Sequence, residues 1–258
     1  DFWLAESQPA WPVLDGTLKR LLARSAWRVV ANSRAVAAHL PGRVTVIHNG
    51  IDSARFDPTL AGRPFRDAWG ISPSAPLVGM VGRLRPWKGA GRFLEVAATV
   101  ARREPESRFL VVGGNPFDGM ANDYTNRLRE QGEALGLRER VTFTGHLDDV
   151  RPALAAMDLF LHPGDPEPFG LVTVEAMAMA RPVVAFAHGA LPELIDEGQS
   201  GRLVPPRDEG AMAAAVLGLL ADAGERERLG RAARQRVEER FDIRRTAAEL
   251  EALYRQLR

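Results

Sequence analysis

Short apolar runs alternate with longer amphipathic segments through the central part of the chain, from about residue 76 onward. The apolar runs are Leu77–Val81, Phe109–Val112, Val141–Phe143, Leu159–Leu161, Val183–Phe186 and Arg202–Val204. Helical spacing occupies most of the intervals, at Gly91–Arg103, Asn122–Leu135, Val150–Met157, Gly170–Ala180 and Leu191–Glu197. Strands that alternate with helices indicate βαβ units. Strand runs that are apolar throughout indicate a sheet covered on both faces. The pattern therefore predicts an α/β fold with six parallel strands and helices on both faces of the sheet.

The flanking segments have a different pattern. Before the regular region we expect a helix over Leu14–Ala26, strands over Trp27–Ala31 and Val44–Ile47, and between them a short helix through Leu40 capped by Ser33. After Pro206 the spacing is helical from Asp208 to Arg258, with breaks expected at Gly224 and at Phe241-Asp242. The chain starts at Asp1 without a methionine or a signal peptide, so we expect it to be a piece of a longer protein.

Composition excludes several classes of protein. With 45% hydrophobic and 26% charged residues, the 258-residue chain has the composition of a globular protein rather than a disordered or fibrous one. No run approaches the ~20 apolar residues that a bilayer span needs. The net charge of +1 argues against a nucleic-acid partner, because nucleic-acid binders carry a basic excess. The chain has no cysteine, which excludes disulfides and thiolate metal sites.

Glycines follow almost every predicted strand. Gly82 and Gly145 are two of them, and others occur at Gly113-Gly114, Gly164 and Gly189. In open parallel sheets, ligands bind beyond the carboxyl ends of the strands. Glycines there allow a ligand to approach the backbone closely, although tight strand-to-helix turns use glycine for the same conformational reason.

The loop Gly82–Gly89 contains two cations, Arg83 and Lys88, close to one strand end. A guanidinium and an ammonium group suit a diphosphate, because arginine can bind two oxygens and lysine acts as a point charge. The alternative is a solvated basic loop. Lysine is rare in this chain, where only Lys19 and Lys88 occur among 34 basic residues, and this rarity favours a function for Lys88.

The segment 165–175 carries two carboxylates, Glu167 and Glu175. Pro166 and Pro168 exclude a helix through Glu167, so this residue lies on a stiff loop. Gly170 opens a helix whose free N–H groups can bind an anion. Glu175 lies inside that helix and leans back toward its start, where it could accept hydrogen bonds from two vicinal hydroxyls. The alternative for Glu175 is a surface residue favoured by the helix dipole.

Several sets of residues occur together in an order that is typical of one family. They are Gly82-Arg83 with Lys88-Gly89; His162-Pro163, Glu167, Pro168-Phe169-Gly170-Leu171 and Glu175; Pro182-Val183-Val184-Ala185, Gly189, Pro192-Glu193, Gly198, Gly201 and Leu203-Val204; and Val46–Asp52 with Phe56. Over about residues 27–258 the chain resembles the donor-binding half of a retaining glycosyltransferase of family 4. The resemblance implies one Rossmann-like half of a two-domain GT-B enzyme, which binds a nucleotide-diphospho-sugar between its domains.

The resemblance also implies roles for individual residues. Arg83, Lys88 and Glu167 are the expected catalytic group, with the two cations on the diphosphate and Glu167 on the donor sugar. The expected donor-binding residues are Gly82, Gly145, Phe169, Gly170, Leu171, Val172 and Glu175, with Glu175 on the ribose hydroxyls and Gly145 near the base. We expect Arg83, Lys88, Glu167 and Glu175 to line one crevice. The donor would be UDP- or GDP-linked, and the enzyme a hexosyltransferase without metal or other cofactor.

The resemblance divides the chain into three parts. Residues 1–45 are the expected remnant of an N-terminal acceptor domain with its linker, residues 46–240 the nucleotide-sugar domain, and residues 241–258 a crossover helix. We therefore expect the chain alone to be inactive in transfer and to need the N-terminal domain as a partner in cis or in trans. The acceptor, a glycan, a lipid or a small molecule, is left open. The full enzyme is expected to be cytoplasmic, with a peripheral position at the inner membrane surface also open.

The chain departs from the family pattern at three positions. Gly164 stands where serine is usual, and Ala180 and Ala190 stand where glycine is usual.

Two other functions remain open on the sequence alone. One is a nucleotide-sugar binding module without turnover, and the other is a different GT-B enzyme such as a nucleotide-sugar epimerase.

Overall fold

The computed structural model describes residues 21, 25–26, 28–114 and 122–256. Its centre is a six-stranded sheet in which each neighbouring pair of strands is parallel. The strands are β3 (Leu77–Val81), β4 (Arg108–Val112), β5 (Val141–Gly145), β6 (Leu159–His162), β7 (Val183–Phe186) and β8 (Arg202–Val204). All six predicted strands are confirmed. They were predictable because each is an apolar run bounded by turn residues.

The order of the strands places a possible ligand site. The order is β5-β4-β3-β6-β7-β8, so the chain starts in the middle, winds to one edge, and returns to wind to the other. This is the order of a Rossmann fold. β3 and β6 are neighbours at the point where the winding reverses, and ligands bind beyond the strand ends at such a switch point. The loops after β3 and β6 are therefore the first place to look for a site.

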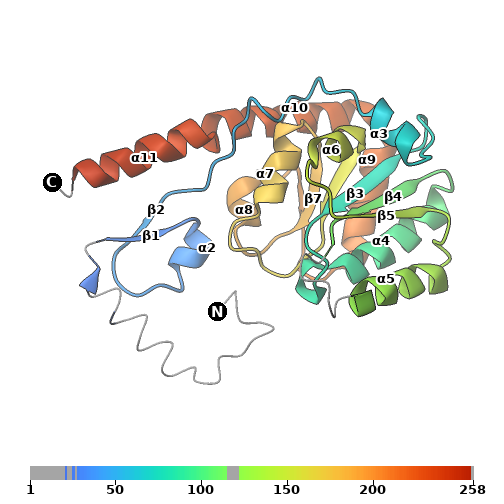
Figure 1. Cartoon of the computed structure of the whole chain (residues 1–258), viewed down its shortest axis with the longest axis horizontal. Helices are drawn as coiled ribbons and strands as arrows, with labels where there is room; N and C mark the ends of the chain where they lie inside the picture. Colours follow the sequence, from blue (N-terminus) through green and yellow to red (C-terminus); the bar gives the residue numbers. More distant parts are fainter. Residues whose placement is uncertain (1–20, 22–24, 27, 115–121, 257–258) are drawn as a thin grey trace.

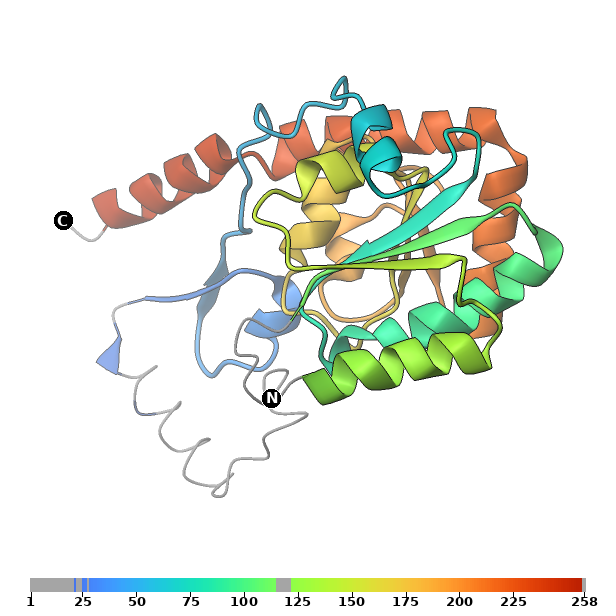
Figure 2. The same ribbon diagram turned by 45° about the vertical axis from the view of Figure 1, so that its right-hand side comes forward.

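Helices cover both faces of the sheet (Figure 1 and Figure 2). One face carries α4 (Ala90–Arg103), α5 (Asn122–Ala134) and α9 (Glu209–Ala221). The other carries α3 (Arg63–Ala68), α6 (Arg151–Ala156), α7 (Leu171–Ala178), α8 (Leu191–Leu194) and α10 (Ala223–Arg240). Alternate strand residues serve opposite faces, as Leu110 and Phe109 of β4 do. The two-sided coverage that the apolar runs predicted is confirmed.

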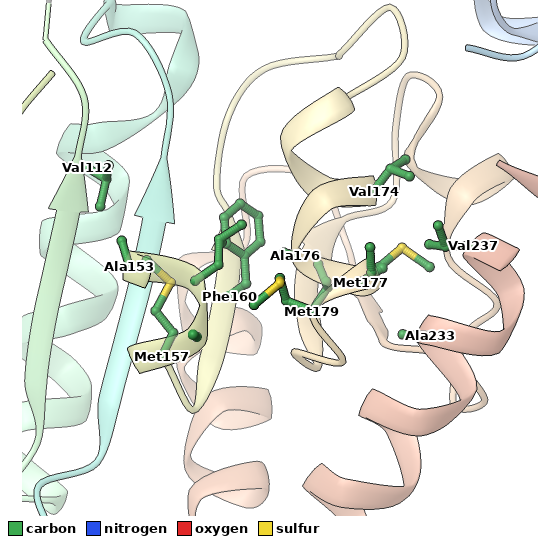
Figure 3. Close-up of a cluster of buried hydrophobic side chains, with 14 of the residues drawn as sticks. Val112, Ala153, Met157, Phe160, Val174, Ala176, Met177, Met179, Ala233 and Val237 are labelled. Atoms are coloured by element: carbon green, nitrogen blue, oxygen red, sulfur yellow. The ribbon is translucent and has the colours of Figure 1, made fainter. Parts of the chain in front are cut away.

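The core on the α7 face contains methionine and phenylalanine side chains among valines and alanines (Figure 3). Met157 and Met179 lie beside Phe160 of β6, and Met177 of α7 reaches toward Val237 of α10. All five side chains are at most 1% exposed. Helix α7 therefore packs between the sheet and α10, with its amino end at the switch point.

The described N-terminal part forms a small unit of its own. β1 (Val29–Ala31) and β2 (Val44–Val46) make a two-stranded parallel sheet, joined through α2 (Arg34–Ala37). The hydroxyl of Ser33 accepts a hydrogen bond from the N–H of Val36, so the predicted cap is confirmed.

The C-terminal helix meets this N-terminal part. α10 ends at Phe241, and Asp242 caps α11 (Ile243–Arg255). The N–H of Ile51 donates to the carbonyl of Phe241, and the N–H of Ile243 donates to the carbonyl of Ile51, both at 2.9 Å. α11 then extends away from the large sheet on the side where β1 and β2 lie (Figure 1 and Figure 2). The break predicted at Phe241-Asp242 is confirmed.

One expectation about secondary structure was wrong, and one helix was missed. The break expected at Gly224 occurs at Asp222 instead, whose side chain caps α10 by accepting from the N–H of Glu225, while Gly224 lies inside that helix. Helix α3 was not predicted, because Arg66 at a buried position interrupts its apolar pattern. The helix expected over residues 14–26 lies outside the described residues, except for positions 21, 25 and 26. In the described part of the chain, no helix is long and apolar enough to cross a membrane.

Candidate donor site at the switch point of the sheet

A cavity of about 1,050 Å³ opens at the carboxyl ends of β3 and β6. It lies between two loops of the large sheet and the described N-terminal part of the chain. Its lining residues from the first loop are Gly82, Arg83, Arg85, Trp87 and Lys88, and those from the second run from His162 to Val172 without Gly164. Met80 and Val81 of β3 and Leu161 of β6 also line it. Asn32, His39 and Asn49 contribute from the N-terminal side.

The two loops touch each other through their backbones. The first contains the 3-10 helix η2 (Pro86–Lys88) and ends at Gly89, which has a φ of 80°. A side chain at Gly89 would place its Cβ 2.2 Å from the carbonyl oxygen of Pro163, and the N–H of Asp165 donates to the carbonyl of Trp87 at 2.7 Å. Gly164 is crowded as well, because a Cβ there would lie 3.1 Å from the ring of His162. Glycine at position 164 therefore fits this close contact.

Lys88 and Glu167 meet where the loops touch. The ammonium group of Lys88 forms an ion pair with Oε1 of Glu167, and it lies 4.2 Å from the centre of the Trp87 ring. Nε2 of His162 is 3.4 Å from the same carboxylate oxygen. The Lys88 cation is thus held between a carboxylate and an aromatic face, on the wall of the cavity.

Glu167 is ionised in this setting. Burial alone would raise its pKa, but the hydrogen bond and charge of His162 together with the charge of Lys88 lower the pKa to about 2. A carboxylate with such a pKa accepts hydrogen bonds at neutral pH and is not a proton donor. Glu167 is therefore suited to bind hydroxyl groups.

Arg83 stands at the same cavity and keeps its charge available. It is exposed, and its guanidinium carbon lies 5.9 Å from the centre of the Trp87 ring. Among the described residues no carboxylate forms an ion pair with it. A polyanionic ligand in the cavity would therefore meet Arg83, the neighbouring Arg85, and Lys88, which is shared with Glu167.

The amino end of α7 faces the same space. Gly170 precedes the helix with a φ of 96°, a conformation that favours glycine. The N–H groups of Leu171 and Val172 have no acceptor among the described residues, as is usual for a first helical turn. Phe169 is 3% exposed and packs its ring against Phe241, so only its backbone is available to a ligand. These free N–H groups and the helix dipole favour an anion.

The structure thus brings most of the predicted site residues together. Gly82, Arg83, Lys88, Glu167, Phe169, Gly170, Leu171 and Val172 all line one cavity. Glu175 and Gly145 are not among its lining residues. Glu175 is half-buried one turn deeper in α7, and burial raises the pKa of its carboxyl. Gly145 ends β5 with a φ of 71°.

The sequence did not predict the wall formed by the N-terminal part. Asn32, His39 and Asn49 reach the cavity only because β1, β2 and α2 are placed beside it. Asn49 belongs to the His48-Asn49-Gly50 turn in a stretch that carried the family resemblance, which was the one available signal. Among the described residues, no group of three or more His, Cys, Asp or Glu side chains could hold a metal ion.

Comparison with known proteins identifies the family. The family model described as "Glycosyl transferases group 1" matches residues 75–222. The chain belongs to the group 1 glycosyltransferases. D-inositol 3-phosphate glycosyltransferase 2 of Catenulispora acidiphila is 37% identical over 220 residues, which are 78% of this chain and 51% of that protein. The chain spans about half the length of this and similar curated relatives.

Two further comparisons cover a larger share of the related protein. The lipopolysaccharide core biosynthesis mannosyltransferase LpsB of Rhizobium meliloti is 32% identical, and the match covers 92% of this chain and 68% of that protein. The crystal structure of Anabaena HepE in complex with UDP-glucose superposes with a TM-score of 0.82 at 30% identity, covering 93% of this chain and 68% of that chain. The fold expected from the resemblance, one half of a GT-B glycosyltransferase, is confirmed.

Proposed function

We propose that this chain is the donor-binding half of a retaining glycosyltransferase, which binds a UDP- or GDP-linked sugar for transfer to a hydroxyl acceptor. One observation carries the proposal. Arg83 and Lys88 from one loop and the free N–H groups of Leu171 and Val172 from another line a single cavity at the switch point of a Rossmann sheet. Cations opposite a helix amino end suit a diphosphate. The UDP-glucose complex of the related HepE supports the same donor class.

The same groups suit the chemistry of the leaving group. When the bond from the sugar to the diphosphate breaks, negative charge grows on the diphosphate oxygens. Arg83, Lys88 and the α7 N–H groups can stabilise that charge, because their charges and dipoles are already in place before the reaction. Glu167 is ionised, with its pKa lowered to about 2 by His162 and Lys88, so it does not carry a proton to donate to the leaving group at neutral pH. Glu167 is proposed to accept hydrogen bonds from hydroxyls of the donor sugar.

Glu175 and Gly145 are proposed to contact the nucleoside of the donor rather than its diphosphate or sugar. Glu175 lies deeper along α7 than the cavity wall and is proposed to receive the ribose hydroxyls. Gly145, with its backbone turned by a positive φ, is proposed to lie near the base. The acceptor and the sugar are not specified by this geometry. The cytoplasmic location stays a prediction of the family resemblance.

We further propose that the chain alone does not transfer sugar at a useful rate. Transfer needs the acceptor hydroxyl within about 3–3.5 Å of the reacting carbon. The charged groups assembled here are proposed to recognise a donor, and the acceptor is proposed to be held by an N-terminal domain that acts in cis or in trans. Calorimetric titration with UDP, GDP and ADP, followed by a transfer assay on simple glycoside acceptors, tests both parts. Binding without turnover supports the proposal, whereas robust turnover would locate an acceptor site within this chain.

A further inference from the structure

Glu193 joins the large sheet to the N-terminal part of the chain. It lies in α8, and its side chain is 13% exposed. One carboxylate oxygen accepts from the N–H of Ala35 at 2.9 Å. The other accepts from the N–H of Arg34 at 2.9 Å and lies 3.0 Å from Nε2 of His48. A single carboxylate therefore has three partners more than 140 residues away in sequence.

These contacts supply acceptors for the first N–H groups of α2. The helix has four residues, and an isolated helix of that length is not stable in water. Its first N–H groups need acceptors. Glu193 supplies two of them, at Arg34 and Ala35, and Ser33 supplies the next one at Val36. The negative charge at this end also suits the helix dipole.

A second contact ties the same segment to the loop of Glu167. The buried hydroxyl of Ser33 donates to the carbonyl of Pro168 at 2.6 Å. The N–H of Ala190 donates to the carbonyl of Glu167 at 2.9 Å. The element that carries Glu193 and the loop that carries Glu167 are thus joined to each other, and both are joined to residues 33–35. Asn32, directly before this segment, lines the cavity with Glu167.

We propose that Glu193 is a positioning residue that fixes the N-terminal wall of the cavity against the loop of Glu167. The wall is formed by Asn32, His39 and Asn49. The inference rests on the proposed function in one respect: if Glu167 binds the donor sugar, this wall faces the sugar rather than the nucleotide. Removing Glu193 then weakens binding of the sugar portion of the donor and leaves the nucleoside diphosphate contacts intact.

Two variants and one matched control test the inference in this chain. Glu193→Ala removes all three contacts. Glu193→Gln keeps one acceptor oxygen and places an amide group against the donor N–H groups, so it is expected to have an intermediate effect. Asp196→Ala is the control, because Asp196 lies three residues farther along, its side chain is 59% exposed, and that carboxylate pairs only with Arg236, at 3.9 Å, among the described residues. Circular dichroism shows that each variant is folded.

The first measurement is amide hydrogen exchange. Glu193→Ala is expected to speed amide exchange at Arg34, Ala35 and Val36 about tenfold or more, because the free energy of opening the first turn of α2 is then smaller. Exchange in β3 and β6 is expected to stay as in the wild type. Unchanged exchange at Arg34 and Ala35 overturns the inference.

The second measurement compares UDP with UDP-glucose by calorimetry. Glu193→Ala is expected to weaken UDP-glucose binding about three- to tenfold and to leave UDP binding within about twofold of the wild type. The control, Asp196→Ala, is expected to bind both ligands within about twofold of the wild type. An equal loss for both ligands overturns the inference, because it indicates a general structural defect. If the wild type binds neither ligand, GDP and GDP-mannose take their place in the same comparison. If it binds none of the four, the proposed function fails, and the exchange measurement alone decides the positioning of residues 33–36.

Discussion

Lys88 and Glu167 are 79 positions apart in sequence, and their side chains form an ion pair at the switch point. They lie in the loops that follow β3 and β6, which are neighbouring strands of the sheet. Neither residue is placed by its own element alone. Gly89 and Gly164 allow the two loops to touch, and this contact brings the charges together. In the proposed function, the ion pair must open or share Lys88 when a diphosphate enters the cavity.

Substitution of the two cations is predicted to weaken diphosphate binding. Arg83→Ala and Lys88→Ala each remove a charged hydrogen bond to the ligand, worth about 1.5–3 kcal/mol, or about ten- to two-hundredfold in the dissociation constant. Titration of UDP into each variant measures this loss. Arg138→Ala is the control, since Arg138 is 80% exposed and precedes β5, at the opposite end of the strands from the cavity. Equal binding by all three variants would contradict the role of the cations.

Glu175→Ala is predicted to reduce discrimination between UDP and 2′-deoxy-UDP. In the proposed site the Glu175 carboxylate accepts hydrogen bonds from the ribose hydroxyls, so its loss affects only the ligand that has both hydroxyls. Titration of both nucleotides into the wild type and the variant gives the ratio. A ratio that is unchanged by the substitution would place the ribose elsewhere.

The pH dependence of stability is predicted to carry the signature of Glu167. The pKa of Glu167 is lowered from 4.5 to about 2 in the folded chain, so its ionised form is favoured by folding. This contribution is full above pH 4.5 and is lost as the pH falls toward 2. By linkage it amounts to about 3 kcal/mol as an order of magnitude.

Chemical unfolding at several pH values isolates that contribution. The free energy of unfolding of the wild type is expected to fall more steeply in the acid range than that of Glu167→Gln, which cannot titrate at this position. Other carboxylates titrate equally in both proteins and cancel in the difference. Identical pH profiles would mean that Glu167 has no favourable partner in the folded state.

Gly89→Ala is predicted to destabilise the chain by more than about 2 kcal/mol. Its φ of 80° is unfavourable for alanine, and the added Cβ would collide with the carbonyl of Pro163. Gly218→Ala is the matched control, because Gly218 lies inside α9, a methyl group added there would have nothing within 4 Å, and alanine favours a helix. Thermal unfolding measures both. A Gly89→Ala protein as stable as the control would show that the loops do not need to touch.

Sequence patterns predicted the sheet well and the cavity only in part. The strands were predictable because both faces of the sheet are covered, which makes each run continuously apolar. Helix α3 was missed because Arg66 points into the protein and donates to the carbonyl of Ala156, where the helical pattern requires an apolar residue.

The residues of the site were likewise predictable only in part. Arg83, Lys88 and Glu167 follow strand ends, and the topology rule for parallel sheets brings such residues together. Asn32, His39 and Asn49 follow no such rule, because their place depends on contacts such as that between Glu193 and α2. Contacts between segments more than 100 residues apart have no local signal in a single sequence.

Calorimetric titration of the wild-type chain with UDP, UDP-glucose, GDP and ADP tests the central claim most directly. The claim is that Arg83, Lys88 and the amino end of α7 form a nucleoside-diphosphate site. It predicts saturable binding of UDP or GDP, of one site per chain, that is weakened by Lys88→Ala and unchanged by Arg138→Ala. The absence of binding by every nucleotide at millimolar concentration, in a chain shown to be folded, would contradict the claim.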